Sequence, residues 1–394
     1  MKPIYFDHAA TTPLDKRVLE KMMPYFTDIF GNANSQHMFG REAIKGVDTA
    51  RDTIAKLINC KPSELYFTSG GTEADNWVLK GVADAYKEKG KHIIITQIEH
   101  AAMLETAKAL EKKGFEVSFA KPTTEGIITP EEIESLIRPD TILIGCMFAN
   151  NEIGTIQPIK EIVEVAKKYK ILTFTDAVQA AGVIKLDVKE LGVDFMSFSA
   201  HKFYGPKGIG ALYVKNGVKI ATMMTGGHQE RTKRGGTTNV PAVIGFAEAF
   251  RIANEELEEN AKYVTMLRDR FIDGILKEVP FVRLNGHRTK RLPANADFSF
   301  EYIEGESILF SLDLAGIAVS SGSACSSGSL DPSHVLLAIG VPVEVAHGSI
   351  RFTFGKHNTV EEVDYAIKSV KEIVERLRAL SPLFNAKDGE IKNV

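Results

Sequence analysis

Hydrophobic and polar positions alternate along this chain between short apolar runs and longer amphipathic stretches. From Leu65 onward the runs are rich in β-branched and aromatic residues, and several are apolar on both faces, as in a buried parallel sheet. The predicted strands cover residues 65–68, 92–96, 115–119, 141–148, 171–175, 194–198 and 210–214. The stretches between them have helical periodicity. The pattern therefore predicts an α/β domain with a largely parallel sheet covered by helices.

The ends of the chain have a different pattern. Helical periodicity covers residues 15–58, broken by a polar loop at 31–35, and again residues 240–276, where it ends before Pro280. Beyond this point, strands are predicted at 296–301, 317–320 and 349–354, and helices at 304–314 and 359–380. We therefore expect a large domain over residues 15–260. A smaller α+β domain is expected to combine residues 1–14 with residues 261–394.

Composition narrows the class of protein. The chain has 394 residues, 44% of them hydrophobic and 25% charged, which is typical of a globular protein with more than one domain. The net charge of -3 gives no case for nucleic acid or an anionic membrane. No apolar run approaches the roughly 20 residues that span a bilayer. The N-terminus is strand-like rather than a signal peptide.

The three cysteines, Cys60, Cys146 and Cys325, are far apart and odd in number. This spacing gives neither a disulfide framework nor a Cys-x-x-Cys zinc site, and it fits the reducing cytoplasm. Cys325 differs from the other two because it lies in a loop of serine and glycine, residues 319–329. Such a loop cannot pack a core and is expected to be mobile, so its thiol can act as a nucleophile. Cys60 and Cys146 are interpreted as bystanders.

Lys202 follows an apolar run and precedes a turn at Gly205-Pro206. A lysine at the mouth of a buried strand can be partly desolvated, which makes its amine nucleophilic. The chemistry that uses such an amine is a Schiff base with a carbonyl, including that of pyridoxal phosphate (PLP). An ordinary surface lysine is the alternative.

Three other segments also join a predicted strand to a polar turn. Residues 68–75 contain Gly71 and Thr72 at the start of a helix, which suits a phosphate, although Thr72 can also simply cap the helix. Asp176 at the end of a buried run needs a cationic partner, such as a protonated pyridine nitrogen, or else caps the next helix. Gln179 can reach the ring's phenolic oxygen. His100 can stack on a planar cofactor and move protons.

Arg351 is an arginine within an apolar run. Its planar guanidinium suits a substrate carboxylate bidentately, and an interdomain salt bridge is the alternative.

Taken together, these motifs resemble the NifS/IscS-type cysteine desulfurases, PLP enzymes of the class V aminotransferase group with fold type I. The resemblance covers nearly the whole chain, from residues 5–13 to 380–383. It rests on the following segments in fixed order: Asn150-Asn-Glu-Ile-Gly154, Asp176-x-x-Gln179, Ser199-Ala-His-Lys202, Ser321-Gly-Ser-Ala-Cys325 and Arg351.

The resemblance implies a role for each residue. Lys202 holds PLP covalently, His100 stacks on its ring, Asp176 pairs with the ring nitrogen and Gln179 with the phenolic oxygen. The phosphate is bound by Gly71, Thr72, Ser199 and His201, with Thr237 reaching it from the partner of a homodimer. Asn151 and Arg351 hold the cysteine carboxylate, and Asn151 also contacts the cofactor. Lys202, His100 and Cys325 are the catalytic residues.

The expected reaction converts L-cysteine into L-alanine and leaves a persulfide on Cys325. The sulfur then passes to an iron–sulfur scaffold or another acceptor protein, for iron–sulfur cluster assembly or tRNA thiolation. No resident metal is expected, although Cys325 can be a transient iron–sulfur ligand. The alternatives are a selenocysteine lyase or another class V PLP enzyme. A non-catalytic sulfur or iron–sulfur carrier is disfavoured, because such a carrier needs clustered cysteines.

Overall fold

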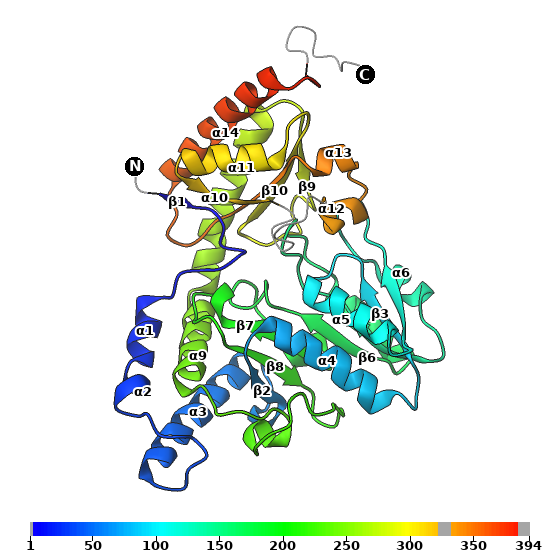
Figure 1. Cartoon of the computed structure of the whole chain (residues 1–394), viewed down its shortest axis with the longest axis vertical. Helices are drawn as coiled ribbons and strands as arrows, with labels where there is room; N and C mark the ends of the chain where they lie inside the picture. The colour runs from blue at the N-terminus through cyan, green and yellow to red at the C-terminus, as the bar shows by residue number, and fades with distance from the viewer. Residues whose placement is uncertain (1–2, 322–331, 385–394) are drawn as a thin grey trace.

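The computed structural model describes residues 3–321 and 332–384. Figure 1 shows two parts stacked along the long axis of the molecule, with helix α10 (Leu257–Glu278) running from the lower part into the upper one. The N-terminal segment passes beside the junction between the two parts before entering α1 (Lys16–Met22). Residues at the start of the chain therefore contact both parts.

A seven-stranded sheet forms the centre of the lower part, in the order β2-β8-β7-β6-β5-β3-β4. Strand β8 is antiparallel to both of its neighbours, and the other pairs are parallel. The predicted fold class, a mostly parallel α/β sheet, is confirmed. The strands are β2 (Leu65–Thr68), β3 (His92–Thr96), β4 (Glu116–Ala120), β5 (Thr141–Gly145), β6 (Leu172–Asp176), β7 (Phe195–Ser199) and β8 (Gly210–Val214).

Helices cover both faces of this sheet. In β3, Ile94 belongs to one hydrophobic core and Ile93 and Ile95 to another, because successive side chains of a strand point to opposite faces. This two-sided burial explains why the strands read as continuous apolar runs. The covering helices are α1, α2 (Pro24–Thr27), α3 (Met38–Leu57), α4 (Gly71–Tyr86), α5 (Ala101–Glu111), α6 (Pro130–Ser135), α7 (Ile159–Lys168), α8 (Val188–Leu191) and α9 (Val240–Glu255).

The upper part is built on a four-stranded antiparallel sheet in the order β12-β13-β10-β9. Its core is aromatic: the ring of Phe271 on α10 lies 4.6 Å from that of Phe352 and 5.5 Å from that of Phe354. The elements are β1 (Ile4–Tyr5), β9 (Val282–Asn285), β10 (Asn295–Phe300), α11 (Gly305–Leu314), β11 (Ile317–Ala318), β12 (Ser320–Ser321), α12 (His334–Ala338), α13 (Val343–Ala346), β13 (Ser349–Thr353) and α14 (Val360–Leu380).

The structure differs from the sequence prediction at several boundaries. The long helical pattern over 240–276 is two helices that meet at Glu256. Strand β5 ends at Gly145 rather than at residue 148, although the N–H groups of Cys146 and Phe148 still donate to the carbonyls of Phe174 and Asp176 on β6. The predicted strand 317–320 is divided between β11, which pairs with β1, and β12, which pairs with β13. The domain boundaries predicted at residues 14 and 260 stay a prediction.

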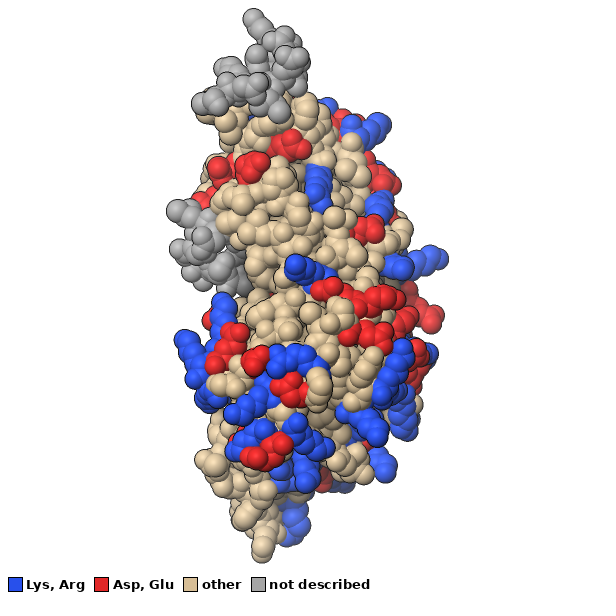
Figure 2. Space-filling model, turned by 90° about the vertical axis from the view of Figure 1, so that its right-hand side faces the viewer, with Lys and Arg blue, Asp and Glu red and all other residues tan. Residues whose placement is uncertain are grey.

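The surface carries both signs of charge. On the face in Figure 2, lysine and arginine side chains are interspersed with aspartate and glutamate over the lower half of the molecule. Within residues 3–321 and 332–384, no helix is both long and apolar enough to cross a membrane.

Candidate active site

Lys202 lies on a short 3-10 turn, Ala200–Lys202, directly after β7. The side chain is half-buried. Its Nζ donates to the carbonyl oxygens of Ala9 and Ala10, at 2.5 and 2.9 Å. The turn thus places a lysine at the edge of a buried sheet, against the N-terminal segment.

Lys202 opens onto a cavity of about 300 Å³ at the carboxyl ends of the parallel strands. This edge is where ligands bind in open α/β sheets. All of the predicted cofactor and substrate residues except Thr237 line this cavity: Gly71, Thr72, His100, Asn151, Asp176, Gln179, Ser199, His201, Lys202 and Arg351.

Two predicted residues are absent from this set for different reasons. Thr237 is exposed and lines a different cavity with Thr68, Gly208 and Glu230. Cys325 lies outside the described residues.

Asp176 is the last residue of β6 and is buried. Its Oδ1 accepts from the N–H of Val178 at 2.8 Å. Burial raises the pKa of the carboxyl, while the N–H of Val178 and the nearby His100 and Lys202 favour the charged form. The carboxyl therefore fixes the turn after β6 and lines the cavity; the next helix, α8, is capped by Asp187, so the alternative that Asp176 caps it is wrong.

His100 is the N-cap of α5, and its Nδ1 accepts from the N–H of Ala102 at 3.1 Å. In the neutral imidazole the proton is consequently on Nε2. Burial lowers the pKa of His100; Asp176 acts in the opposite direction, and Lys202 and His334 lower it further. The geometry therefore favours a neutral ring with its N–H on the side away from the helix.

The start of α4 forms one end of the cavity. The helix begins at Gly71, and its N-cap, Gly70, makes no side-chain capping bond, so the alternative that Thr72 merely caps this helix is wrong. A Cβ on Gly71 would lie 2.6 Å from Cγ2 of Val178, so a larger residue is excluded unless Val178 shifts. Free N–H groups at such a helix start are suited to a phosphate.

Four of the residues predicted to hold a phosphate, Gly71, Thr72, Ser199 and His201, also line an adjoining cavity of about 390 Å³, which Lys207 borders as well. Burial lowers the pKa of His201 to about 4, and Lys202 and Lys207 contribute in the same direction. His201 is thus a neutral hydrogen-bonding group, and Lys207 supplies a positive charge that the sequence interpretation missed.

Arg351 on β13 is buried. Its Nη1 donates to the carbonyl of Asn151 at 2.9 Å, and its Nη2 to Oδ1 of Asp7 at 3.0 Å. This salt bridge joins two residues of the predicted small domain, so it is not the interdomain salt bridge of the alternative interpretation, and the guanidinium also lines the cavity. Its Nε has no hydrogen-bond partner in the part of the chain that the structure describes.

The two described cysteines lack a reactive thiolate. Burial raises the pKa of the Cys60 thiol to about 12 and that of Cys146 well above its usual range. Both are free thiols. Their interpretation as bystanders therefore has a physical basis, because the thiolate is the nucleophilic form.

Residues absent from the sequence prediction complete the site. Asp75 lines the cavity, and Ser197 lies between Asp75 and Asp176. In the sequence Asp75 lies between Ala74 and Asn76 early in a helix, where no motif gives it a role. Asp7 lies more than 300 positions from Arg351, so no local pattern could have shown their pairing.

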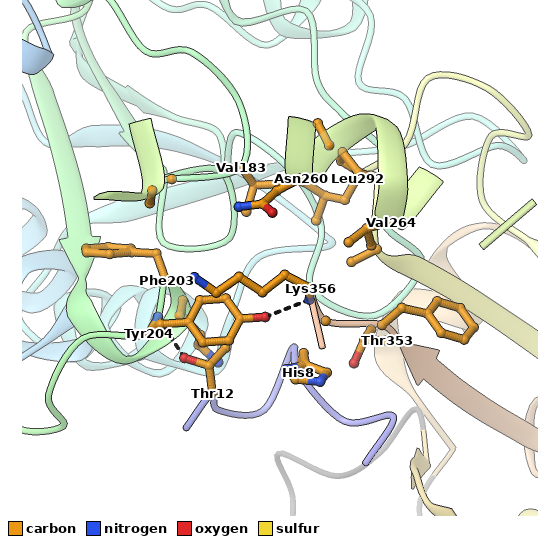
Figure 3. Close-up of a pocket in the computed structure, with 18 of the residues that line it drawn as sticks. His8, Thr12, Val183, Phe203, Tyr204, Asn260, Val264, Leu292, Thr353 and Lys356 are labelled. Carbon is orange, nitrogen blue, oxygen red and sulfur yellow. Dashed lines mark hydrogen bonds between the residues drawn. The ribbon is translucent and has the colours of Figure 1, made fainter. Parts of the chain in front are cut away.

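A second cavity, of about 100 Å³, lies on the other side of Lys202. Figure 3 shows its apolar wall of Val183, Val264 and Leu292. Tyr204 and Lys356 face each other there, joined by a hydrogen bond from the Lys356 N–H to the Tyr204 hydroxyl at 3.1 Å. Among the residues that line this cavity, no buried acid lacks a cationic partner.

The first cavity fits PLP by its donor set. A lysine amine suits the aldehyde, a buried carboxylate suits the protonated ring nitrogen, and a helix start suits the phosphate. The fold and the site together define a PLP enzyme of fold type I.

Comparison with known proteins agrees with this assignment. The family model of the class V aminotransferases matches residues 4–366. A cysteine desulfurase IscS from Dictyoglomus turgidum is 52% identical over 381 residues, which are 97% of this chain and 97% of that protein.

Two solved structures have the same fold. A NifS-like protein superposes with a TM-score of 0.90 at 42% identity and covers 95% of this chain and 100% of its own. The structure of SspA in complex with cysteine superposes with a TM-score of 0.80 at 34% identity, over 90% of this chain and 100% of its own. The chain belongs to the class V aminotransferase family and, within it, to the IscS-type cysteine desulfurases.

Proposed function

We infer that this chain is a PLP-dependent cysteine desulfurase, which takes the sulfur from L-cysteine and leaves L-alanine. One observation carries the inference: in a chain half identical to curated cysteine desulfurases, one cavity joins Lys202, Asp176, His100 and Arg351. The reaction class needs a nucleophilic amine, an acid for the ring nitrogen, a proton carrier and a carboxylate site.

The residues that hold the cofactor are assigned from the cavity. When bound, PLP supplies an electron sink for negative charge that develops beside the substrate amine. Asp176 holds the ring nitrogen as a carboxylate, Gln179 faces the ring oxygen, and the start of α4 with Ser199 and His201 holds the phosphate. Lys202 is the amine on the cavity wall that binds the aldehyde and afterwards moves protons.

His100 has two tasks in this proposal. Its ring covers the cofactor, and its Nε2 carries a proton, since Nδ1 is occupied by the N–H of Ala102. A neutral imidazole with a lowered pKa can take part in proton transfer near neutral pH without placing a second cation beside Lys202.

Arg351 and Asn151 receive the substrate carboxylate. The guanidinium of Arg351 is fixed by the Asn151 carbonyl and by Asp7, which leaves the Nε–H for a ligand. A carboxylate held there would orient the rest of a small amino acid toward Lys202.

Cys325 is the proposed sulfur acceptor. Strand β12 ends at Ser321, four positions before Cys325 in the sequence, and Ser320 is paired with Arg351 in the sheet. The segment that carries Cys325 therefore begins beside the proposed carboxylate site. The high thiol pKa values of Cys60 and Cys146 leave Cys325 as the chain's candidate nucleophile.

The partners are proposed from surface features. We propose a homodimer, since exposed apolar side chains gather on the N-terminal helices and Thr237 lies away from the Lys202 cavity of its own chain. The sulfur acceptor is proposed to be an iron–sulfur scaffold or another acceptor protein, which would dock near the exposed Leu380 and Leu383. We also propose a cytoplasmic location, because Cys60 and Cys146 are free thiols and the cytoplasm keeps thiols reduced.

Mass spectrometry of the holoenzyme after addition of L-cysteine tests the function. A mass gain of one sulfur on Cys325, together with free alanine, is expected. Cys325→Ser should retain the visible absorbance of the cofactor and release no alanine over repeated turnovers. Sustained alanine release by this variant would refute the assignment of the nucleophile.

A further inference from the structure

Two buried carboxyl groups share a single serine hydroxyl at the base of the cavity. Oγ of Ser197 lies 2.7 Å from Oδ1 of Asp75 and 3.4 Å from Oδ1 of Asp176. The three residues are 1%, 0% and 7% exposed for Asp75, Ser197 and Asp176. A serine hydroxyl has one proton, so it can donate to only one of the two carboxyl groups at a time.

The arrangement is fixed by the backbone. Ser197 on β7 is paired in register with Asp176 on β6, and Asp75 lies in the second turn of α4, which packs on this sheet. Asp75 also lines the cavity that contains Lys202. The pairing of strands and the packing of α4 therefore hold both acids against Ser197.

The surroundings of the two acids differ. Asp176 accepts from the N–H of Val178 and lies near His100 and Lys202, all of which favour its ionised form. Among the described residues, Ser197 is the hydrogen-bond partner of the Asp75 side chain. Burial raises the pKa of Asp75 well above its usual range, and the nearby Asp176 and Glu99 raise it further. If one of the two acids holds a proton, it is Asp75.

We propose that Asp75 is a neutral positioning residue. Its carboxylic O–H donates to Oγ of Ser197, and the Ser197 O–H in turn donates to Oδ1 of Asp176. This chain of donors stabilises the Asp176 carboxylate, and Val178 fixes its orientation toward the ring nitrogen. Only that last role depends on the proposed function, because the proton on Asp75 is a property of the chain itself.

The relay has a physical advantage over two ionised acids. Two carboxylates around one hydroxyl would repel each other, and one of them would then compete with the ring nitrogen for a proton. With Asp75 neutral, the site presents a single negative charge, matched to a single positive charge on the ring. Asp75 thereby determines which acid is ionised without contacting the cofactor nitrogen.

Infrared difference spectroscopy of the full-length holoenzyme tests the proposal. The carbonyl stretch of a protonated carboxylic acid is separate from the carboxylate and amide bands. The spectrum of Asp75→Asn is subtracted from that of the unaltered protein, with aspartate side chains labelled with ¹³C to separate them from glutamate. A protonated aspartate band is expected near neutral pH, well above the ordinary aspartate pKa of about 3.9.

The isotope label and a second variant exclude the other buried acids. Burial raises the pKa of Glu99 to about 8, but its band is not shifted by the aspartate label; burial raises the pKa of Asp297 to about 7, so its band is identified separately. Asp297→Asn serves as the matched control, and the band assigned to Asp75 is expected to persist in it. If the protonated aspartate band is still present in Asp75→Asn, or is absent from the unaltered protein, the proposal is overturned.

Cofactor retention gives a second readout, which does not require turnover. The rate at which visible absorbance is lost on dilution should stay within about threefold for Asp75→Asn, because the amide N–H₂ can donate to Ser197 as the acid does. Ser197→Ala should lose the cofactor about tenfold faster, since the Asp176 carboxylate loses a hydrogen bond. An Asp75→Asn protein that releases the cofactor as fast as Ser197→Ala would show that a charge on Asp75 is required, and would overturn the proposal. Failure of the proposed function would instead appear as an absence of cofactor absorbance in the unaltered protein.

Discussion

The two cavities that meet at Lys202 differ in whether their acidic side chains have cationic partners. Asp75 and Asp176 line the cavity toward the sheet, Glu99 lies buried nearby, and burial is the largest influence on each, raising the pKa. In the cavity behind Lys202, Nζ of Lys356 lies 3.1 Å from Asp15 and 3.1 Å from Glu256. There, hydrogen bonds from Arg17 are the largest cause of the low pKa of both acids.

The difference indicates where a ligand belongs. The acids of the rear cavity already have cationic partners, so that wall is electrostatically complete. The acids of the front cavity have hydrogen bonds and a few distant charges, and the charge that would complete them has to come from a ligand. The rear cavity in Figure 3 has an apolar wall, whereas buried charge identifies the front one as the ligand site.

The largest expected effect separates the two lysines at this junction. Lys202→Ala should lower alanine production by roughly 10³-fold or more, because the covalent anchor and the proton carrier are removed together. Lys356→Ala, from the rear cavity, should retain activity within a few-fold. Alanine release from L-cysteine measures both variants. Equal losses in the two would mean that the cavities are not functionally distinct.

Replacing one acid from each cavity, Asp176 or Asp15, should give a smaller difference in turnover. Asp176→Asn removes the negative charge beneath the ring nitrogen and should lower turnover by roughly 10²- to 10³-fold, the range seen when a preorganised electrostatic contact is lost. Asp15→Asn removes a charge of the rear cavity and should affect thermal stability rather than turnover. Steady-state kinetics combined with thermal unfolding distinguishes these results. Near-normal turnover in Asp176→Asn would contradict the assignment of that acid.

Lys202 and Asp176 could be predicted because they lie at or just after the end of a strand. Lys202 and Asp176 follow apolar runs, and the carboxyl ends of neighbouring parallel strands share one edge of a sheet, so the periodicity alone brings the two residues together. Strand β9 was missed, since it follows Pro280 and carries the polar Arg283 and Asn285 among its four residues.

What could not be predicted depends on contacts between distant segments. The relay through Ser197 requires β6 and β7 to pair in one particular register and α4 to pack above them. The bond between Arg351 and Asp7 joins residues 344 positions apart. Local pattern contains neither kind of information.

Glu99, buried near the front cavity, and Glu256, which pairs with Lys356 of the rear cavity, should also give opposite pH dependences of stability. The pKa of Glu99 is raised to about 8, so folding favours its protonated form, and its contribution to stability declines as the pH rises from about 4.3, the unfolded value, to about 8. Glu256 has a pKa lowered to about 2, mainly by Arg17, so its contribution is present above about 4.3 and is lost as the pH falls toward 2.

Substitutions can measure each slope. Glu99→Gln should flatten the decline above about pH 4.3, by roughly 1–3 kcal/mol in the free energy of unfolding. Glu256→Gln should remove part of the loss at acid pH, by at most about 1 kcal/mol, because its side chain is partly exposed. Denaturant unfolding at a series of pH values tests both. Parallel curves for Glu99→Gln and the unaltered protein would contradict the raised pKa.

The smallest expected effect concerns Asp7, an acid near the front cavity that already has a cationic partner, Arg351. Asp7 lies 3.0 Å from Nη2 of Arg351, so its charge opposes that of an incoming substrate carboxylate. In Asp7→Asn the amide oxygen can still accept from Arg351 and hold its orientation, but the competing charge is gone. KM for L-cysteine should therefore fall by roughly threefold with kcat nearly constant, because binding before the chemical step is strengthened uniformly.

Asp7→Ala separates orientation from charge: if the Arg351 position depends on this contact, the alanine variant should raise KM while the asparagine variant lowers it. A KM that rises equally in both would show that the negative charge of Asp7 is needed at the carboxylate site, and would place this acid with the paired acids of the rear cavity.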